Sequence, residues 1–155
     1  MAIGDEVTDF ELQDETGTPR KLSTMLESGP VVLFFYPIAS SGGCTQEACH
    51  FRDLSGEFAT LGAQPVGISS DNVTKQSMFA TSNQLGFPLL SDSGHKVAKS
   101  LGAWRAWLPG GLHTRRKTFV IGQDRKILAD IGSESKFDLH ADEALDALRK
   151  HQAAA

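Results

Sequence analysis

Two cysteines, Cys44 and Cys49, are the only thiols of this 155-residue chain. Cys44 follows an apolar run, Val31 to Tyr36, and a Ser/Gly loop, and it opens a stretch with helical periodicity. A thiol at a helix N-terminus faces free backbone N–H groups and the positive end of the helix dipole, and both favour the thiolate. A pKa lowered by about two units corresponds to about 2.7 kcal/mol and leaves most of the thiol ionised at neutral pH. We therefore expect Cys44 to be a reactive nucleophile.

The spacing of Cys44 and Cys49 predicts that the helix must open before the two thiols can pair. Five residues of α-helix rise about 7.5 Å and turn about 140°, which places the two Cα atoms about 8.6 Å apart. A disulfide usually needs Cα atoms within about 7 Å of each other. If both residues are helical in the reduced protein, the bond requires local unwinding. The same spacing argues against a thioredoxin-type oxidoreductase, in which two residues separate the cysteines.

The segment around the cysteines resembles the peroxiredoxins, specifically the Q or bacterioferritin comigratory protein (BCP) type. The family signature Pro-x-x-x-Thr/Ser-x-x-Cys is matched by Pro37, Ser41 and Cys44. The helix glutamate of the family corresponds to Glu47, three residues after the first cysteine. The resolving cysteine, five residues after the first, corresponds to Cys49.

A distant arginine extends the resemblance beyond this local motif. Arg116, in RRKTFVI, stands two residues before the Thr-Phe that opens a late strand, where the family has its arginine. The segments GISSD, PLLSD and TFVI also follow in family order, so the resemblance covers nearly the whole chain. The common Thr-Pro-Gly-Cys of the family is Ser-Gly-Gly-Cys here. Ser41 lacks the methyl group that restricts χ1, and Gly42 adds backbone freedom, so we expect a looser pocket and easier unwinding.

The resemblance implies a thiol peroxidase that reduces hydrogen peroxide and organic hydroperoxides. Cys44 would attack the peroxide and become a sulfenic acid, and Cys49 would then form an intramolecular disulfide with it. The Ser41 hydroxyl and the backbone N–H groups of Gly43 and Cys44 would hold the peroxide oxygens. Arg116 would stabilise the thiolate and the transition state, because its guanidinium is always charged.

Two further residues have supporting roles in this scheme. Pro37 has no N–H and would shape the pocket wall without competing for the thiolate. Glu47 has the wrong sign to activate a thiol, so we expect it to orient Arg116 or a neighbouring polar network. Thioredoxin, glutaredoxin or a mycoredoxin-like protein would reduce the disulfide, and the resemblance implies no cofactor. The resemblance also favours a monomer or a weak dimer, because the resolving thiol lies on the same chain.

Other interpretations of these residues are open from the sequence alone. The protein could be a redox sensor or redox-gated binding module with little turnover, in which oxidation of Cys44 melts the helix start. Cys49 could be an inert core residue, and Ser41 could be a helix N-cap alone. A metal site formed by the cysteines and nearby histidines fits no common zinc spacing, so we expect no metal.

Composition and charge narrow the class of protein. A net charge of −4 gives no electrostatic reason to expect a nucleic acid or an anionic membrane as partner. The longest apolar run, Val31 to Tyr36, is too short to span a bilayer, and no signal peptide is visible in MAIGDEVTDFEL. We expect one domain over residues 1–155, located in the cytoplasm.

Hydrophobic periodicity predicts an α/β, thioredoxin-like fold: a mixed central sheet flanked by helices, with an N-terminal β-hairpin around DETGTP. The expected strands are 31–36, 65–68, 87–90, 118–121 and 127–131, and the expected helices are 44–61, 73–85, 94–101 and 141–149. Asp71 and Asp92 are expected to be caps or turn residues. The irregular segment 102–114 carries four large apolar residues: Trp104, Trp107, Leu108 and Leu112. Two interpretations are open for them: they are packing residues, or they form an apolar collar beside the active site.

Overall fold

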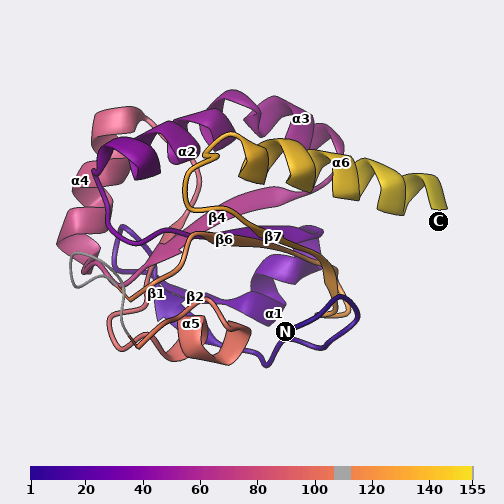
Figure 1. Ribbon diagram of the computed structural model, residues 1–155, viewed down its shortest axis with the longest axis horizontal. Coiled ribbons are helices and arrows are strands. Elements are labelled where there is room, and N and C mark those ends of the chain that lie inside the picture. The colour runs from indigo at the N-terminus through magenta and orange to yellow at the C-terminus, as the bar shows by residue number, and fades with distance from the viewer. Residues whose placement is uncertain (107–112, 155) are drawn as a thin grey trace.

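A five-stranded mixed sheet forms the centre of the computed structural model, which describes residues 1–106 and 113–154 (Figure 1). Its order is β5-β4-β3-β6-β7, and β3 pairs in parallel with β4 and antiparallel with β6. A separate hairpin of β1 and β2 precedes it. The strands are β1 (Glu11–Gln13), β2 (Pro19–Lys21), β3 (Val31–Phe35), β4 (Gln64–Ser69), β5 (Leu89–Ser91), β6 (Lys117–Ile121) and β7 (Ile127–Gly132). The predicted α/β, thioredoxin-like fold with an N-terminal hairpin is confirmed.

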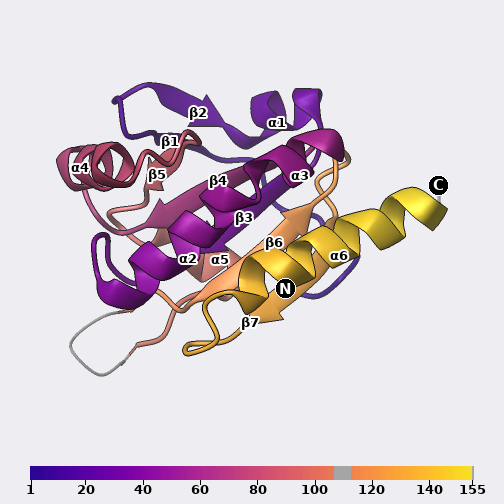
Figure 2. The same cartoon turned by 90° about the horizontal axis from the view of Figure 1, so that it is seen from above.

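Helices cover both faces of the sheet (Figures 1 and 2). One face is covered by α2 (Gly42–Asp53), α3 (Ser55–Thr60), α4 (Val73–Asn83) and α6 (Leu139–Ala154). The other carries the hairpin, α1 (Leu22–Met25), the 3-10 turn η1 (Leu26–Ser28) and α5 (Lys96–Leu101). Because strand side chains alternate between faces, Phe34 packs under α2 while Phe35 packs into the opposite core. This double cover explains why β3 is buried at every position.

The predicted single helix over 44–61 is wrong in one respect, because the structure divides it into α2 and α3. Leu54 ends the first helix with φ −97° and ψ 7°, and the next helix begins immediately with Ser55 and Gly56. Serine and glycine are weak helix formers, which makes this a low-cost place for a break. Phe51 and Phe58 nevertheless stack on each other across the break with centroids 5.8 Å apart, so the apolar periodicity continues through it.

The two aspartates expected to be caps or turn residues, Asp71 and Asp92, make different kinds of contact. Asp92 accepts hydrogen bonds from the N–H groups of Val97 and Ala98 in the first turn of α5. Asp71 does not cap α4, whose N-cap is Asn72. The Asp71 carboxylate instead accepts a hydrogen bond from the Ala39 N–H at 2.7 Å, and it thereby fixes the loop before α2 to the end of β4.

Trp104 lies away from the cysteines. It packs against the core on the hairpin side of the sheet, with the Lys99 ammonium 4.7 Å from its ring centroid and the His113 ring stacked on it. The collar interpretation of Trp104 is therefore wrong. The other three members, Trp107, Leu108 and Leu112, lie outside the described residues.

The C-terminal helix α6 is longer than predicted and extends beyond the end of the sheet (Figures 1 and 2). Its buried residues lie on one side, toward the core that also contains Cys44: they are His140, Ala141, Ala144, Leu145 and Leu148. No helix in the described part of the chain is long and apolar enough to cross a membrane.

Candidate active site

Cys44 lies in the first turn of α2, directly after the loop that leaves β3. Ser41 is the N-cap of this helix, and its Oγ accepts a hydrogen bond from the Cys44 N–H at 3.3 Å. The Cys44 side chain is fully buried. A serine in an extended conformation before a helix satisfies one of the free N–H groups of the first turn, which explains why the helix begins here. The thiol is thus held near the positive end of the helix dipole.

Arg116 reaches this thiol from a distant part of the chain. Its Nη2 lies 3.3 Å from the Cys44 Sγ, and its side chain is almost entirely buried. The antiparallel register of the sheet explains the approach, because Lys117 at the start of β6 pairs with Phe35 at the end of β3. The residue before β6 therefore lies beside the loop that leads into α2.

Glu47 is the second residue that contacts the Arg116 guanidinium. It is one helical turn after Cys44, so both side chains lie on the same side of α2. Its Oε1 accepts from the Arg116 Nη1 at 3.4 Å. Burial raises the pKa of the Glu47 carboxyl from 4.5 to about 8, although the Arg116 charge opposes this rise. Within the described residues, neither the Oε2 of Glu47 nor the Nε of Arg116 has a hydrogen-bond partner.

A buried histidine that the sequence analysis missed stands behind Glu47. The His140 Nε2 lies 3.4 Å from the Glu47 Oε2 and 2.9 Å from the Ser133 carbonyl oxygen, and its Nδ1 lies 2.7 Å from the Thr118 Oγ1. Burial lowers the pKa of this imidazole below its usual 6.5. The only sequence signal was its spacing from Ala144 and Leu148, which places it on the buried side of α6.

Phe137, also missed, covers the site from the β7–α6 loop. The Arg116 guanidinium carbon lies 4.8 Å from the centre of its ring. A Cβ added to Gly43 would lie 2.6 Å from two atoms of the same ring. Gly43 is therefore required for the close packing of Phe137 on the first turn of α2.

One of the two backbone donors expected to bind peroxide already has a partner in the helix cap. The Cys44 N–H already donates to the Ser41 Oγ. The Ser41 Oγ lies in turn 3.3 Å from the Ile38 carbonyl oxygen, to which it donates. A ligand at the Cys44 N–H must therefore share this donor with the cap. Pro37 is half-buried in the loop between β3 and α2, close in sequence to this cap.

Cys49 faces away from this cluster. It is half-buried on α2, and its Sγ lies 3.7 Å from the Asn83 Oδ1 at the end of α4. The Asn83 carbonyl accepts from the Arg52 Nη1 at 2.7 Å, which joins the ends of the two helices. Both cysteines are free thiols and both are helical, so the structure corresponds to the reduced arrangement for which the spacing predicts unwinding.

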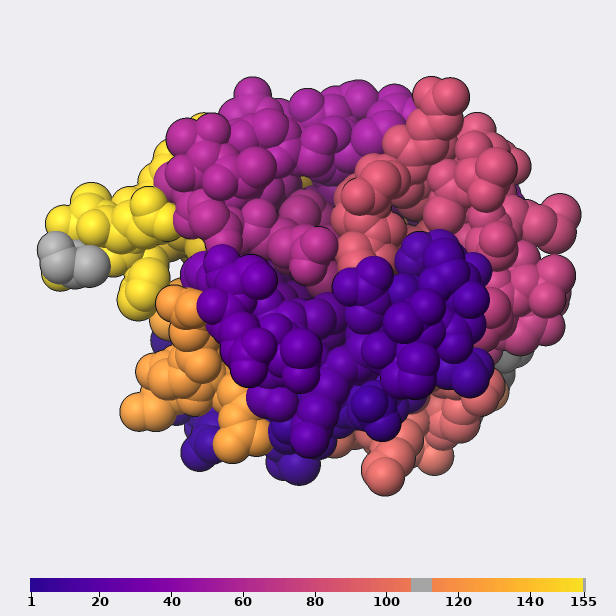
Figure 3. Space-filling model, turned by 180° about the vertical axis from the view of Figure 1, so that it is seen from behind, coloured from indigo at the N-terminus to yellow at the C-terminus, as the bar shows by residue number. Residues whose placement is uncertain are grey.

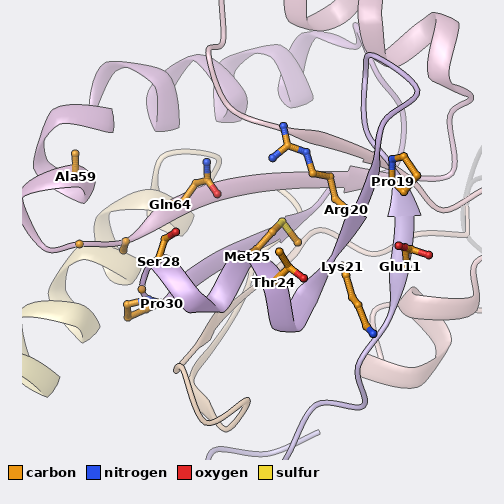
Figure 4. Close-up of a pocket in the computed structure, with 13 residues that line it drawn as sticks. Glu11, Pro19, Arg20, Lys21, Thr24, Met25, Ser28, Pro30, Ala59 and Gln64 are labelled. Carbon is orange, nitrogen blue, oxygen red and sulfur yellow. The ribbon is translucent and has the colours of Figure 1, made fainter.

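A cavity of about 610 Å³ lies elsewhere on the molecule (Figures 3 and 4). It is a groove between the N-terminal hairpin with α1 and the α3–β4 connection, and Figure 4 shows Arg20, Met25 and Gln64 on its walls. It contains none of the residues around Cys44 and no thiol. Among the described residues, no group of three or more metal-ligating side chains could hold a metal ion.

Comparison with known proteins agrees with this geometry. The family model described as "AhpC/TSA family" matches residues 3–129. Peroxiredoxin Bcp of Bacillus subtilis is 35% identical over 152 residues, covering 96% of each chain. The crystal structure of the peroxidoxin BcpB from Mycobacterium tuberculosis is 56% identical with a TM-score of 0.91 and covers 97% of each chain. A solved structure of the Xanthomonas campestris bacterioferritin comigratory protein is 28% identical, with a TM-score of 0.83, and the match covers 92% of this chain and 91% of that one.

A buried thiol at a helix start, contacted by an arginine from a distant part of the sequence, thus occurs in a chain that these proteins match over almost their whole length. The chain belongs to the AhpC/TSA family and is a peroxiredoxin of the Q/BCP type.

Proposed function

We propose that this peroxidase uses Cys44 as its peroxide-reacting thiolate and Cys49 as its resolving thiol. The observation that carries the proposal is the 3.3 Å contact between the Arg116 Nη2 and a fully buried Cys44 Sγ in the first turn of α2. A guanidinium that donates to sulfur interacts more favourably with a thiolate than with a neutral thiol. The contact therefore stabilises the ionised, nucleophilic form. The substrates are hydrogen peroxide and organic hydroperoxides, and the alkyl peroxide reduction activity of the Xanthomonas campestris relative supports the second class.

In the first step, the Cys44 sulfur attacks the terminal peroxide oxygen. A sulfur–oxygen bond forms while the oxygen–oxygen bond breaks, and the departing hydroxide or alkoxide takes a proton and leaves as water or alcohol. Sulfur is oxidised to the sulfenic acid. Charge moves from sulfur to the departing oxygen, and Arg116 is the donor placed to follow it, while the Ser41 hydroxyl can join it by turning away from the Ile38 carbonyl.

In the second step, the Cys49 sulfur attacks the Cys44 sulfenic acid: the sulfur–sulfur bond forms, the sulfur–oxygen bond breaks, and the departing hydroxide takes the proton given up by the Cys49 thiol and leaves as water. Both thiols lie on α2 and face different neighbours, so the first turns of the helix have to open. A dithiol protein of the thioredoxin, glutaredoxin or mycoredoxin type then reduces the disulfide by exchange. Because the chain carries both thiols, a monomer or weak dimer suffices, and we place its work in the reducing cytoplasm.

The test is intact-mass spectrometry of the reduced protein after one equivalent of peroxide. A loss of two hydrogens from the monomer supports the Cys44–Cys49 disulfide, and Cys49→Ser should instead hold a stable sulfenic acid. Cys44→Ser should abolish both products. Peroxide-dependent NADPH oxidation with thioredoxin and its reductase should be catalytic, whereas consumption that stops after one equivalent would identify a redox sensor. An unmodified protein would overturn the proposal.

A further inference from the structure

The loop that leads into α2, residues 37–40, has few contacts that hold it in place. Within the described part of the chain, one hydrogen bond joins this loop to a distant segment, from the Ala39 N–H to the Asp71 Oδ2 at 2.7 Å. The outer side of the loop borders a cavity of about 230 Å³, and Ile38 and Met78 on its wall are 37% and 64% exposed. Packing on that side is therefore sparse, and the conformation of the loop depends on Asp71.

The contact with Asp71 orients one peptide group, the one between Ile38 and Ala39. Its N–H donates to Asp71, and its C=O accepts from the Ser41 hydroxyl at 3.3 Å. The N–H and C=O of a trans peptide point in opposite directions, so Asp71 holds one side of the group and Ser41 lies on the other. The Ser41 hydroxyl donates its only proton to Ile38, which leaves an Oγ lone pair to accept from the Cys44 N–H at 3.3 Å. A continuous series of donors and acceptors therefore runs from Asp71 to the turn that carries the thiol.

Ser40, the next residue of the loop, has a backbone conformation that needs support. Its φ is 66°, in the left-handed region that residues other than glycine seldom adopt. Such conformations persist only where neighbouring contacts hold them. The Asp71 hydrogen bond precedes Ser40 and the Ser41 cap follows it, so these two contacts enclose the strained residue. Loss of the Asp71 contact should let Ser40 relax and displace the cap.

Buried side chains in turn fix the position of Asp71. The Ser69 Oγ donates to the Asp71 Oδ2 at 2.7 Å and accepts from the Gln76 Nε2 at 3.0 Å. The same Nε2 donates to the Leu90 carbonyl at 2.8 Å, and the Tyr36 hydroxyl donates to the Gln76 Oε1. A buried network in which each polar group has a partner makes its members rigid. Asp71 is therefore a rigid support, tied to β4, α4 and β5 and independent of the loop that it holds.

We propose that Asp71 is a positioning residue for the start of α2: by holding the Ile38–Ala39 peptide, it keeps the helix cap in place and determines how readily the first turn opens. The proposal deepens the function proposed above and rests on it, because opening matters to the reaction only if Cys49 must reach Cys44. Asp71 favours the closed turn, in which the Cys44 thiol is buried, over the open turn in which the disulfide forms. Its loss should therefore speed the second chemical step and not the first.

Hydrogen–deuterium exchange of the reduced protein tests this role without peroxide. Asp71→Ala removes the acceptor, whereas Asp71→Asn keeps a carbonyl oxygen that can accept from both donors. We expect Asp71→Ala to speed exchange in peptides covering residues 42–49 by about fivefold, the equivalent of about 1 kcal/mol and the typical contribution of an N-cap. Asp71→Asn should stay within about twofold of wild type, because asparagine replaces aspartate well as an acceptor of backbone N–H groups.

Asp92→Ala is the matched control. Asp92 is also a buried aspartate that accepts from backbone N–H groups, but these belong to the first turn of α5, on the other face of the sheet. Its loss should destabilise α5 and leave exchange over residues 42–49 unchanged. Ser69→Ala tests the support of Asp71 without changing Asp71 itself, and it should speed this exchange in the same way as Asp71→Ala.

Quenched-flow mass spectrometry after one equivalent of peroxide measures the two chemical steps in the same variants. Sulfenic acid should form no faster in Asp71→Ala than in wild type, because the closed turn still predominates. The disulfide should form about fivefold faster, since the turn opens more readily. A general loss of stability would give a different pattern, because Asp92→Ala would share it and Asp71→Asn would not be expected to restore it.

Any of four outcomes would overturn the proposal. One is wild-type exchange over residues 42–49 in a folded Asp71→Ala or, if that variant does not fold, in Ser69→Ala. The second is an Asp71→Asn that exchanges as fast as Asp71→Ala, and the third is equal acceleration in Asp92→Ala. The fourth is a disulfide that forms at the wild-type rate despite faster exchange. Exchange requires no peroxide, so a protein that shows the exchange pattern but does not reduce peroxide would refute the proposed function and leave the hold of Asp71 on the helix start intact.

Discussion

The Arg116 guanidinium contacts the Cys44 sulfur at 3.3 Å across 72 residues of sequence. The contact exists because the β3–β6 pairing brings the residue before β6 beside the loop that leads into α2. It exists also because Ser41 starts that helix at a point that leaves Cys44 in its first turn. A local motif and a sheet register therefore determine the candidate site together.

Replacement of Arg116 should affect the first oxidation step most strongly. We expect Arg116→Met to lower the second-order rate constant with hydrogen peroxide by about 10²- to 10³-fold, the usual cost of losing one donor to a developing charge. Arg116→Lys should recover only part of this loss, because one ammonium cannot contact both the Cys44 sulfur and the Glu47 carboxyl as the planar guanidinium does.

The measurement is competition with a haem peroxidase for limiting peroxide. Arg115→Met, at the neighbouring arginine, is the matched control and should keep the rate within about threefold of wild type, a change below 1 kcal/mol. If Arg116→Met fell within that margin too, the guanidinium would have no role at the sulfur.

The sequence identified the residues next to the Cys44 sulfur, but it did not identify the residues that pack behind them. Ser41, Cys44 and Glu47 lie within one helical turn of each other or its cap, so their spacing alone predicts that they share a side of a helix. His140 and Phe137 could not be identified in this way. They belong to the β7–α6 connection and the start of α6, and only the packing of α6 beside α2 brings them to the thiol.

The fold was predictable for a similar reason, and the same reason explains why the break between α2 and α3 was missed. A continuous apolar run identifies β3 because both of its faces are covered. The break between α2 and α3 left no trace in the periodicity, because Phe51 and Phe58 still face the same core across it. Hydrophobic spacing reports the buried side of a segment, and it does not report whether the backbone hydrogen bonds continue.

Glu47 should make the free energy of unfolding depend on pH between 6.5 and 8. Its pKa rises from 4.5 to about 8 on folding, so over this range the native state binds more protons than the unfolded state, and stability falls as pH rises. His140 has the opposite sign, since its pKa is lowered from 6.5 and its effect is a loss of stability as pH falls below that value. The window above 6.5 therefore isolates Glu47.

Urea denaturation at several pH values in this window checks the effect. Wild type should lose up to about 1.4 kcal/mol per pH unit, and Glu47→Gln should be flatter by that amount because the amide does not titrate. Equal slopes in the two proteins would show that Glu47 is ionised in the native state at neutral pH.

Gly43 should tolerate no side chain, whereas its neighbour Gly42 should. A Cβ at Gly43 would lie 2.6 Å from the Phe137 ring, but a Cβ at Gly42 would have no atom within 4 Å. We expect Gly43→Ala to destabilise the protein by about 1–3 kcal/mol, the usual cost of overpacking, and to slow oxidation as Phe137 moves off Arg116.

Gly42→Ala is the matched control and should be stabilising by about 0.5–1 kcal/mol, since alanine favours a helix more than glycine does. Thermal unfolding measures both effects. Adding Phe137→Leu to Gly43→Ala should restore part of the lost stability, and a Gly43→Ala variant as stable as Gly42→Ala would rule out the close contact with Phe137.

Gly42→Pro should separate the two chemical steps. Gly42 is the first residue of α2, the position where proline costs no hydrogen bond and its fixed φ suits the helix. The ring would stiffen the turn that must open before Cys49 can reach Cys44, and it would leave Arg116 in place. We therefore expect sulfenic acid to form at nearly the wild-type rate and the disulfide to form more slowly. Stopped-flow tryptophan fluorescence resolves the two phases, and a second phase as fast as that of wild type would mean that opening of this turn does not limit resolution.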